Sequence, residues 1–181
     1  IQKLCETYAD TALIVVDETY IEFSDQPSSI AKLDQFANLV VLRTLSKSHA
    51  AAGLRCGAAV ARGDVTSLLQ KVLAPYPLAA PVMQAALTIL KPENRAKLAE
   101  KRADIVTRRN GYAKEFAKLE GVQSVLPSDA NYLLVLVRDA ADLYEKARKS
   151  GIILRDQSHQ PGLENAVRIA IGSAEEMQQL L

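Results

Sequence analysis

Two short apolar runs, each followed by polar side chains, constrain the fold of this chain more than any other feature. Residues 12–17 are Ala-Leu-Ile-Val-Val-Asp, and residues 38–43 are Asn-Leu-Val-Val-Leu-Arg. Runs of this length that are apolar on both faces are typical of strands in a parallel sheet with helices on both sides. We therefore expect two buried strands that deliver polar groups to one edge of a sheet.

The segments around these runs alternate between helical and extended patterns, which predicts an α/β fold. A third strand is expected at residues 57–61, and Asp64 could cap the helix that follows it. The helices expected in this part of the chain cover residues 2–9, 30–37 and 64–73.

Three prolines, Pro75, Pro77 and Pro81, mark the best candidate for a domain boundary. Pro81 can be the first residue of a helix, and a long helix over residues 93–119 is expected after it. We therefore expect the chain to consist of three parts, which are residues 1–74, the connecting helical region 75–110, and residues 111–181.

The third part has the pattern of a small α+β unit. Gly121 should end the long helix, and Gly151 should end a later one. A capping box formed by Ser173 and Glu176 should open the last helix. The elements expected here are strands at 131–137, 152–155 and 166–171, and helices at 140–149 and from 173 onward.

Composition restricts the partners. Apolar residues make up 49% of the chain and charged residues 24%, which is ordinary for a soluble globular protein. The formal net charge of +1 gives no basic field for nucleic acid or an anionic membrane, and no apolar run reaches the roughly 18 residues of a membrane span. We expect a cytoplasmic protein with small-molecule partners. Because Ile1 and Leu181 both fall inside expected helices, we also expect the chain to be a fragment.

Lys47 is a candidate nucleophile. It follows Ser46 just after the second apolar run and precedes a stretch of mostly small residues, 48–53. A lysine attacks a carbonyl when burial or neighbouring cations leave part of it as free amine. The alternative is an ordinary surface lysine in a loop.

Asp17 and Tyr20 follow the first apolar run. A buried carboxylate needs a partner, and a protonated ring nitrogen would supply one through a charge-assisted hydrogen bond. Tyr20 could then donate to an oxygen on the same ring. The alternatives are an aspartate that caps the next turn and an ordinary half-buried tyrosine. Glu18 and Glu22 are expected to be no more than solvated.

Ser46 and Arg55 suit a phosphate group, the first as a hydroxyl donor and the second as a fork of N–H donors. Gly53 and Gly57, on either side of Arg55, would let the backbone come close to that phosphate.

Two arginines in the last part could also bind anions. Arg155 ends one expected strand, and Arg168 lies between β-branched or apolar neighbours in another. An arginine in such surroundings is costly unless it meets an anion. The alternative is an internal salt bridge to Asp156 or Glu164.

Other kinds of site are disfavoured. His49 and His159 stand alone, without cysteines or acids at ligand spacing, so no metal site is expected. The Gly-x-Ser-x-Gly motif of serine hydrolases is absent.

Taken together, these segments resemble the fold-type I pyridoxal-phosphate enzymes, and among them the histidinol-phosphate aminotransferase group. The lysine and Gly-Leu-Arg motifs are shared by many aminotransferases, whereas the Tyr-Ile-Glu-Phe and Ile-Leu-Arg-Asp segments narrow the resemblance to that group. The segments that carry it are residues 16–23, 42–47, 53–57, 74–78, 151–156 and 163–169.

The resemblance implies roles for the candidate residues. Lys47 would bond the aldehyde of pyridoxal 5'-phosphate and move the substrate proton. Asp17 would pair with the pyridinium nitrogen, and Tyr20 would bond the ring hydroxyl. Ser46 and Arg55 would hold the cofactor phosphate. For the substrate, Arg168 would bind the α-carboxylate and Arg155 the phosphate.

The resemblance also implies a domain organisation and a reaction. Residues 1–74 would be the C-terminal part of the large cofactor-binding domain, and residues 111–181 the small domain. The reaction would transfer an amino group between glutamate and imidazole acetol phosphate, giving histidinol phosphate and 2-oxoglutarate in histidine biosynthesis. Family members form homodimers and are about twice as long, so we expect this chain alone to be inactive.

Other functions remain open. Threonine-phosphate decarboxylases and broad aromatic aminotransferases share the same fold and cofactor. An aminotransferase-like regulatory module that binds the cofactor without turnover is an alternative from another class.

Overall fold

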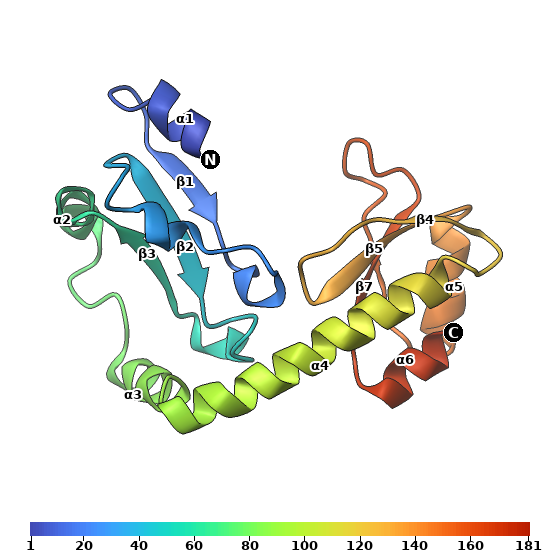
Figure 1. Ribbon diagram of the computed structural model, residues 1–181. Coiled ribbons are helices and arrows are strands. Elements are labelled where there is room, and N and C mark those ends of the chain that lie inside the picture. Colours follow the sequence, from blue (N-terminus) through green and yellow to red (C-terminus); the bar gives the residue numbers. More distant parts are fainter. The chain divides into compact units, whose positions relative to one another are not determined.

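The computed structural model describes all residues, 1–181, and the chain forms two compact units, Ile1–Ala99 and Glu100–Leu181 (Figure 1). The division falls inside one long helix, α4 (Pro92–Phe116). The expected division into three parts, 1–74, 75–110 and 111–181, stays a prediction. No helix is both long and apolar enough to span a membrane.

The first unit contains a three-stranded sheet in the order β1-β2-β3. Its strands are β1 (Ile14–Asp17), β2 (Leu39–Thr44) and β3 (Gly57–Ala61). β1 and β2 are parallel, with Asp17 opposite Leu42, whereas β3 runs antiparallel to β2. The two expected neighbouring strands and the third at 57–61 are therefore confirmed.

The burial of β1 differs from our expectation. Ile14 and Val16 pack with Leu39, Val41 and other residues in an apolar cluster on one face of the sheet. On the other face Val15 is 56% exposed. The expectation that β1 is buried on both faces is wrong within this unit, because none of the unit's own helices packs over that face at Val15.

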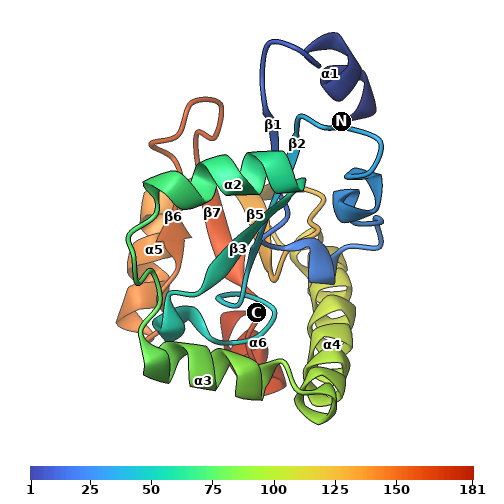
Figure 2. The same cartoon turned by 90° about the vertical axis from the view of Figure 1, so that its left-hand side faces the viewer.

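Besides the start of α4, the first unit contains three α-helices and three 3-10 helices. The α-helices are α1 (Gln2–Thr7), α2 (Gly63–Val72) and α3 (Ala80–Ile89), and the 3-10 helices are η1 (Ile21–Phe23), η2 (Ser29–Lys32) and η3 (Ala52–Leu54). In Figure 2, α2 follows the end of β3, and α3 lies beside η3.

Three local predictions were wrong here. The helix expected at 30–37 is only the short η2, because its backbone hydrogen bonds, such as that from the Leu33 N–H to the Ile30 carbonyl, span three residues rather than the four of an α-helix. Asp64 is not the N-cap of α2, which begins at Gly63, and instead accepts the Val65 N–H. Pro81 is the second residue of α3.

The second unit contains a four-stranded antiparallel sheet in the order β4-β5-β7-β6. The expected helix at 140–149 and the capping box between Ser173 and Glu176 are confirmed. The elements after α4 are β4 (Val122–Val125), β5 (Tyr132–Val137), α5 (Ala140–Lys149), β6 (Arg155–Asp156), β7 (Ala166–Ala170) and α6 (Ala174–Leu180).

Three features of this unit differ from our expectations. β4 was missed because its four residues, Val-Gln-Ser-Val, are too few and too polar to stand out. The strand expected at 152–155 is only the two-residue β6. α4 ends at Phe116, and Gly121 lies beyond it at φ +92°, next to the start of β4.

One face of the second sheet carries the core. Alternate residues of β5 are buried, and they pack with Phe116 of α4 and Met177 of α6. Arg168 of β7 lies opposite Leu134, on the other face. The alternation of β5 and β7 therefore separates an apolar face from a face that carries arginine.

Gly57→Ala should lower the free energy of unfolding by about 1–3 kcal/mol, as overpacking of a rigid site does. A Cβ at residue 57 would lie 2.9 Å from the backbone oxygen of Arg43 in β2. Gly53→Ala is the matched control, since a Cβ at residue 53 meets nothing within 4 Å. Urea unfolding of both variants measures the difference, and equal midpoints would show that β3 does not need glycine at this position.

Candidate active site

Asp17 lies at the carboxyl end of β1, beside β2. Its Oδ1 atom accepts the N–H of Thr19 at 2.9 Å, and the next backbone N–H, that of Glu18, donates to Leu42 of β2. Asp17 therefore caps the turn that follows β1, as the alternative to a cofactor contact predicted. Its second carboxylate oxygen accepts no hydrogen bond, and the side chain is exposed rather than buried as we had expected. The unused oxygen can accept a donor from outside the chain.

Lys47 and Tyr20 lie together. The Nζ atom of Lys47 is 5.2 Å from the centroid of the Tyr20 ring, within the range of a cation–π interaction. Both side chains are half-buried. The lysine thus lies against the turn that follows β1, and the alternative of a lysine extended into solvent does not describe it.

Ser46 and Arg55 lie in the loop that joins β2 to β3. The hydroxyl of Thr44, the last residue of β2, donates to Ser46 Oγ at 3.0 Å and accepts the Ser46 N–H at 3.1 Å. Arg55 is exposed, and its guanidinium donates to the carbonyl of Ala52. The loop is closed by a hydrogen bond from the Leu45 N–H to the Cys56 carbonyl.

The backbone of this loop is strained. Ala50 and Arg55 both adopt left-handed φ angles, +53° and +52°. Each such residue costs of order 1–3 kcal/mol and persists only where its surroundings impose it, which is frequent at functional sites. A Cβ at Gly57 would lie 2.9 Å from the Arg43 carbonyl oxygen, whereas a Cβ at Gly53 meets nothing within 4 Å. That these glycines let the backbone come close to a phosphate stays a prediction.

Glu18 and Glu22 were expected to be solvated, and this is wrong. Glu18 is only 5% exposed and accepts hydrogen bonds from Ser28 Oγ and the Ser29 N–H. Arg43 of β2 forms ion pairs with both glutamates. The sequence did contain a signal for this cluster. Arg43 ends the apolar run at residues 38–43, and an arginine in such a position needs a carboxylate nearby.

Arg155 and Arg168 face each other in the second unit. They are directly opposite in the pairing of β6 with β7, so their side chains lie on the same face of the sheet. The guanidinium of Arg168 lies 4.5 Å from the centroid of the Tyr132 ring. Tyr132 was missed because a tyrosine in a strand is usually part of an ordinary surface.

The internal salt bridges that were the alternative for these arginines do not form. Neither Asp156 nor Glu164 pairs with Arg155 or Arg168. Asp156 instead accepts the Ser158 N–H at 2.8 Å, and hydrogen bonds from Ser158 lower the pKa of Asp156 below its usual value. The two arginines therefore occupy directly opposite positions of the sheet, and neither forms an ion pair with a carboxylate.

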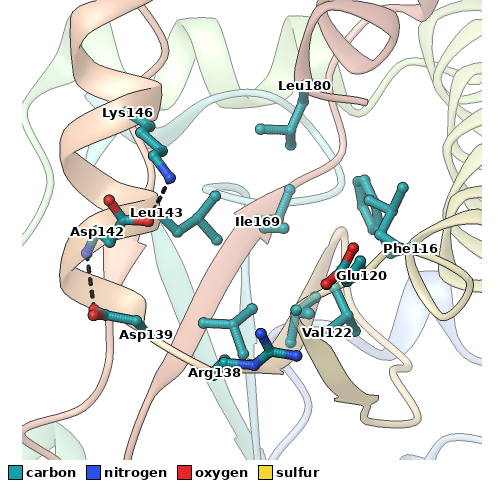
Figure 3. Close-up of a pocket in the computed structure, with 14 residues that line it drawn as sticks. Phe116, Glu120, Val122, Arg138, Asp139, Asp142, Leu143, Lys146, Ile169 and Leu180 are labelled. Carbon is teal, nitrogen blue, oxygen red and sulfur yellow. Dashed lines mark hydrogen bonds and ion pairs between the residues drawn. The ribbon is translucent and has the colours of Figure 1, made fainter.

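A separate hollow of about 400 Å³ lies within the second unit, between α5 and the end of α6. Figure 3 shows Ile169 and Leu143 pointing into it and Lys146 at its rim, where the ammonium pairs with Asp142 at 2.7 Å. None of the candidate site residues lines it, so it is not the predicted site.

The comparisons with known proteins agree on one family. The family model for class I and II aminotransferases matches residues 1–181. The chain is similar to histidinol-phosphate aminotransferase 2 of Mannheimia succiniciproducens, with 40% identity over 176 residues, which are 97% of this chain and 50% of the relative. It is 39% identical over 180 residues to histidinol-phosphate aminotransferase of Escherichia coli O9:H4, covering 99% of this chain and 51% of that one. The chain therefore spans about half the length of these relatives.

Solved structures show the same fold. L-threonine-O-3-phosphate decarboxylase from Porphyromonas gingivalis matches with a TM-score of 0.85 and 25% identity over 98% of this chain and 55% of that chain. Histidinol-phosphate aminotransferase from Sinorhizobium meliloti, solved in complex with pyridoxal-5'-phosphate, matches with a TM-score of 0.84 and 23% identity, covering 99% of this chain and 50% of that one.

These matches confirm the expected α/β fold as that of the fold-type I aminotransferases. Because the family model matches its whole length, the chain belongs to the class I and II aminotransferase family.

Proposed function

We propose that this chain serves in a pyridoxal-phosphate-dependent aminotransferase that transfers an amino group between glutamate and imidazole acetol phosphate, in histidine biosynthesis. The observation that carries the proposal is the position of the Lys47 amine, 5.2 Å from the Tyr20 ring in the turn that follows Asp17. Relatives at about 40% identity that bear the name histidinol-phosphate aminotransferase support the choice of substrate.

The residues present fit the cofactor. Asp17 has a carboxylate oxygen without a hydrogen bond at the end of β1, as a partner for a pyridinium N–H requires. Such a charge-assisted hydrogen bond contributes roughly 1.5–3 kcal/mol. Lys47 offers the amine, and Ser46 and Arg55 offer a hydroxyl and a guanidinium from the same loop for the phosphate. When bound, the cofactor supplies an aldehyde that bonds amines and a ring that accepts electrons.

The work of the protein is to hold these groups and move one proton. Asp17 would accept the ring N–H and so keep the positive charge on the ring. Lys47 would bond the aldehyde through Nζ and, once released by the substrate amine, use the same atom to move the proton of the substrate carbon. Tyr20 would orient the ring oxygen. Asp17 ends β1, Tyr20 lies in the turn after it, and Lys47 lies in the loop that follows β2, so the paired strands hold the segments that carry all three residues.

Arg155 and Arg168 are proposed to bind the anionic groups of the substrates. Arginines at directly opposite positions of a sheet place like charges on one face, and a phosphate or carboxylate would offset this with bidentate hydrogen bonds. Arg168, stacked on Tyr132, would bind the α-carboxylate of glutamate. Histidinol phosphate has an alcohol in place of that carboxylate, so Arg155 would anchor it through its phosphate.

The alternatives have less support. The structural likeness to L-threonine-O-3-phosphate decarboxylase, at 25% identity, keeps a decarboxylase as the second candidate, but the relatives at about 40% identity favour the aminotransferase. Release of carbon dioxide by the intact protein would identify the decarboxylase.

We further propose that the intact protein is a cytoplasmic homodimer, as the family resemblance implies. Light scattering after size-exclusion chromatography tests the dimer, and a monomer at micromolar concentration would overturn it.

Lys47→Ala in the intact protein should abolish covalent retention of pyridoxal phosphate after borohydride reduction, because reduction fixes the cofactor to the amine that bonds its aldehyde. Peptide mass spectrometry measures the label, which should lie on Lys47 in the unaltered protein. Lys71→Ala removes an exposed lysine of α2 and should keep the label. A label on another lysine would contradict the proposal.

Arg155→Ala should raise the Michaelis constant for histidinol phosphate by about 10-fold or more, the equivalent of a lost hydrogen bond to a charged group. The constant for glutamate should change much less, since Arg168 is its proposed partner. Steady-state kinetics of the intact protein measures both. Arg138→Ala, at an exposed arginine outside the pair, is the control, and an unaltered constant for the phosphorylated substrate in Arg155→Ala would refute the assignment.

A further inference from the structure

A partly buried ion-pair cluster lies beside the candidate site and has no part in the function proposed above. We call Glu18, Glu22 and Arg43 the Arg43 clamp. Arg43 Nη2 lies 2.5 Å from Glu22 Oε1, and Arg43 Nη1 lies 3.6 Å from Glu18 Oε2. The side chains are 27%, 16% and 5% exposed for Arg43, Glu22 and Glu18. Partly buried ion pairs such as these are screened less by salt than exposed pairs are.

The clamp connects the two segments that carry the candidate residues. Glu18 and Glu22 lie on either side of Tyr20, two residues before it and two after it. Arg43 belongs to β2, four residues before Lys47. A single guanidinium therefore holds both ends of the turn that presents the Tyr20 ring to the Lys47 amine, 5.2 Å away.

The two ends of the turn depend on Arg43 to different degrees. Glu18 also accepts hydrogen bonds from Ser28 Oγ, at 2.6 Å, and from the Ser29 N–H. The second oxygen of Glu22 is buried and has no hydrogen-bond partner. Loss of Arg43 would leave Glu18 anchored but Glu22 as a buried carboxylate without any partner, which is costly. The far end of the turn, after Tyr20, should then move toward solvent.

We propose that Arg43 is a positioning residue that, through Glu22 and Glu18, fixes Tyr20 against Lys47 and thereby prepares the site for pyridoxal phosphate. This inference rests on the proposed function, in which Lys47 and Tyr20 contact the cofactor. Arginine is needed because its planar fork reaches two carboxylates at once, whereas lysine offers a single point charge.

A double-mutant cycle on the intact protein tests the proposal, with the dissociation constant of pyridoxal phosphate measured by visible absorbance. Arg43→Gln and Tyr20→Ala should each raise the dissociation constant by about 10-fold. The dissociation constant of the double variant should then lie within about 2-fold of the higher of the two single-variant values. Arg43→Lys should not restore binding. The visible circular dichroism of the bound cofactor should change in Arg43→Gln, because the signal reports how the ring is held.

Two further variants keep the test decisive. If Arg43→Gln does not fold, as thermal unfolding of the cofactor-free protein would show, Glu22→Gln takes its place in the same cycle with the same expected coupling. Glu145→Gln removes a glutamate that pairs with Arg148 in the second unit and should leave cofactor binding and dichroism unaltered. Multiplicative effects of the residue 43 (or 22) and residue 20 changes would overturn the proposal, since they would show that the clamp acts on stability alone.

Failure of the proposed function gives a different result. Should the unaltered intact protein show no cofactor absorbance, or should Lys47→Ala keep the covalent label, the aminotransferase proposal falls and the clamp's role falls with it. Should Lys47 carry the label while the cycle shows no coupling, only the role of Arg43 is refuted.

Discussion

The parallel pairing of β1 with β2 is the contact on which the candidate site depends. It places Asp17 opposite Leu42, so both strands end at the same edge of the sheet. Side chains alternate across a strand, and the two acidic residues in succession therefore serve opposite faces. Asp17 lies on the exposed face, where a ligand can reach it, and Glu18 lies on the buried face, where it pairs with Arg43. The candidate cofactor contact and its structural support are thus adjacent in sequence.

Much of the fold could be predicted because its signals are local. The helix at 140–149 has an Asp139 cap and a strong amphipathic pattern, and both of its ends were correct. The helix expected at 30–37 is only the short η2. Its start is fixed by a distant side chain, Glu18, which accepts the Ser29 N–H, and local propensity contains no information about such a contact. β4 escaped notice because it is held by pairing with β5 rather than by its own composition.

The candidate site shows the same limit. Lys47, Ser46 and Arg55 could be proposed from motifs, and they lie in or beside one strained loop of the first unit. The Arg43 clamp could not be inferred with the same ease, because the sequence gives the charges of Glu18 and Glu22 but not their burial. Burial decides whether an ion pair is a solvated surface pair of little energetic weight or a constraint on the backbone.

The arginine pair of the second unit follows from a different physical conflict. Like charges at directly opposite positions destabilise the pairing of two strands, and β6 has only two residues with which to offset that cost. Stacking on Tyr132 fixes the Arg168 guanidinium but does not neutralise it. The proposed binding of an anion by the two arginines would convert the repulsion into favourable interactions. Anion binding and the pairing of β6 with β7 would then stabilise each other, so we expect a bound phosphate or carboxylate to order this edge of the sheet.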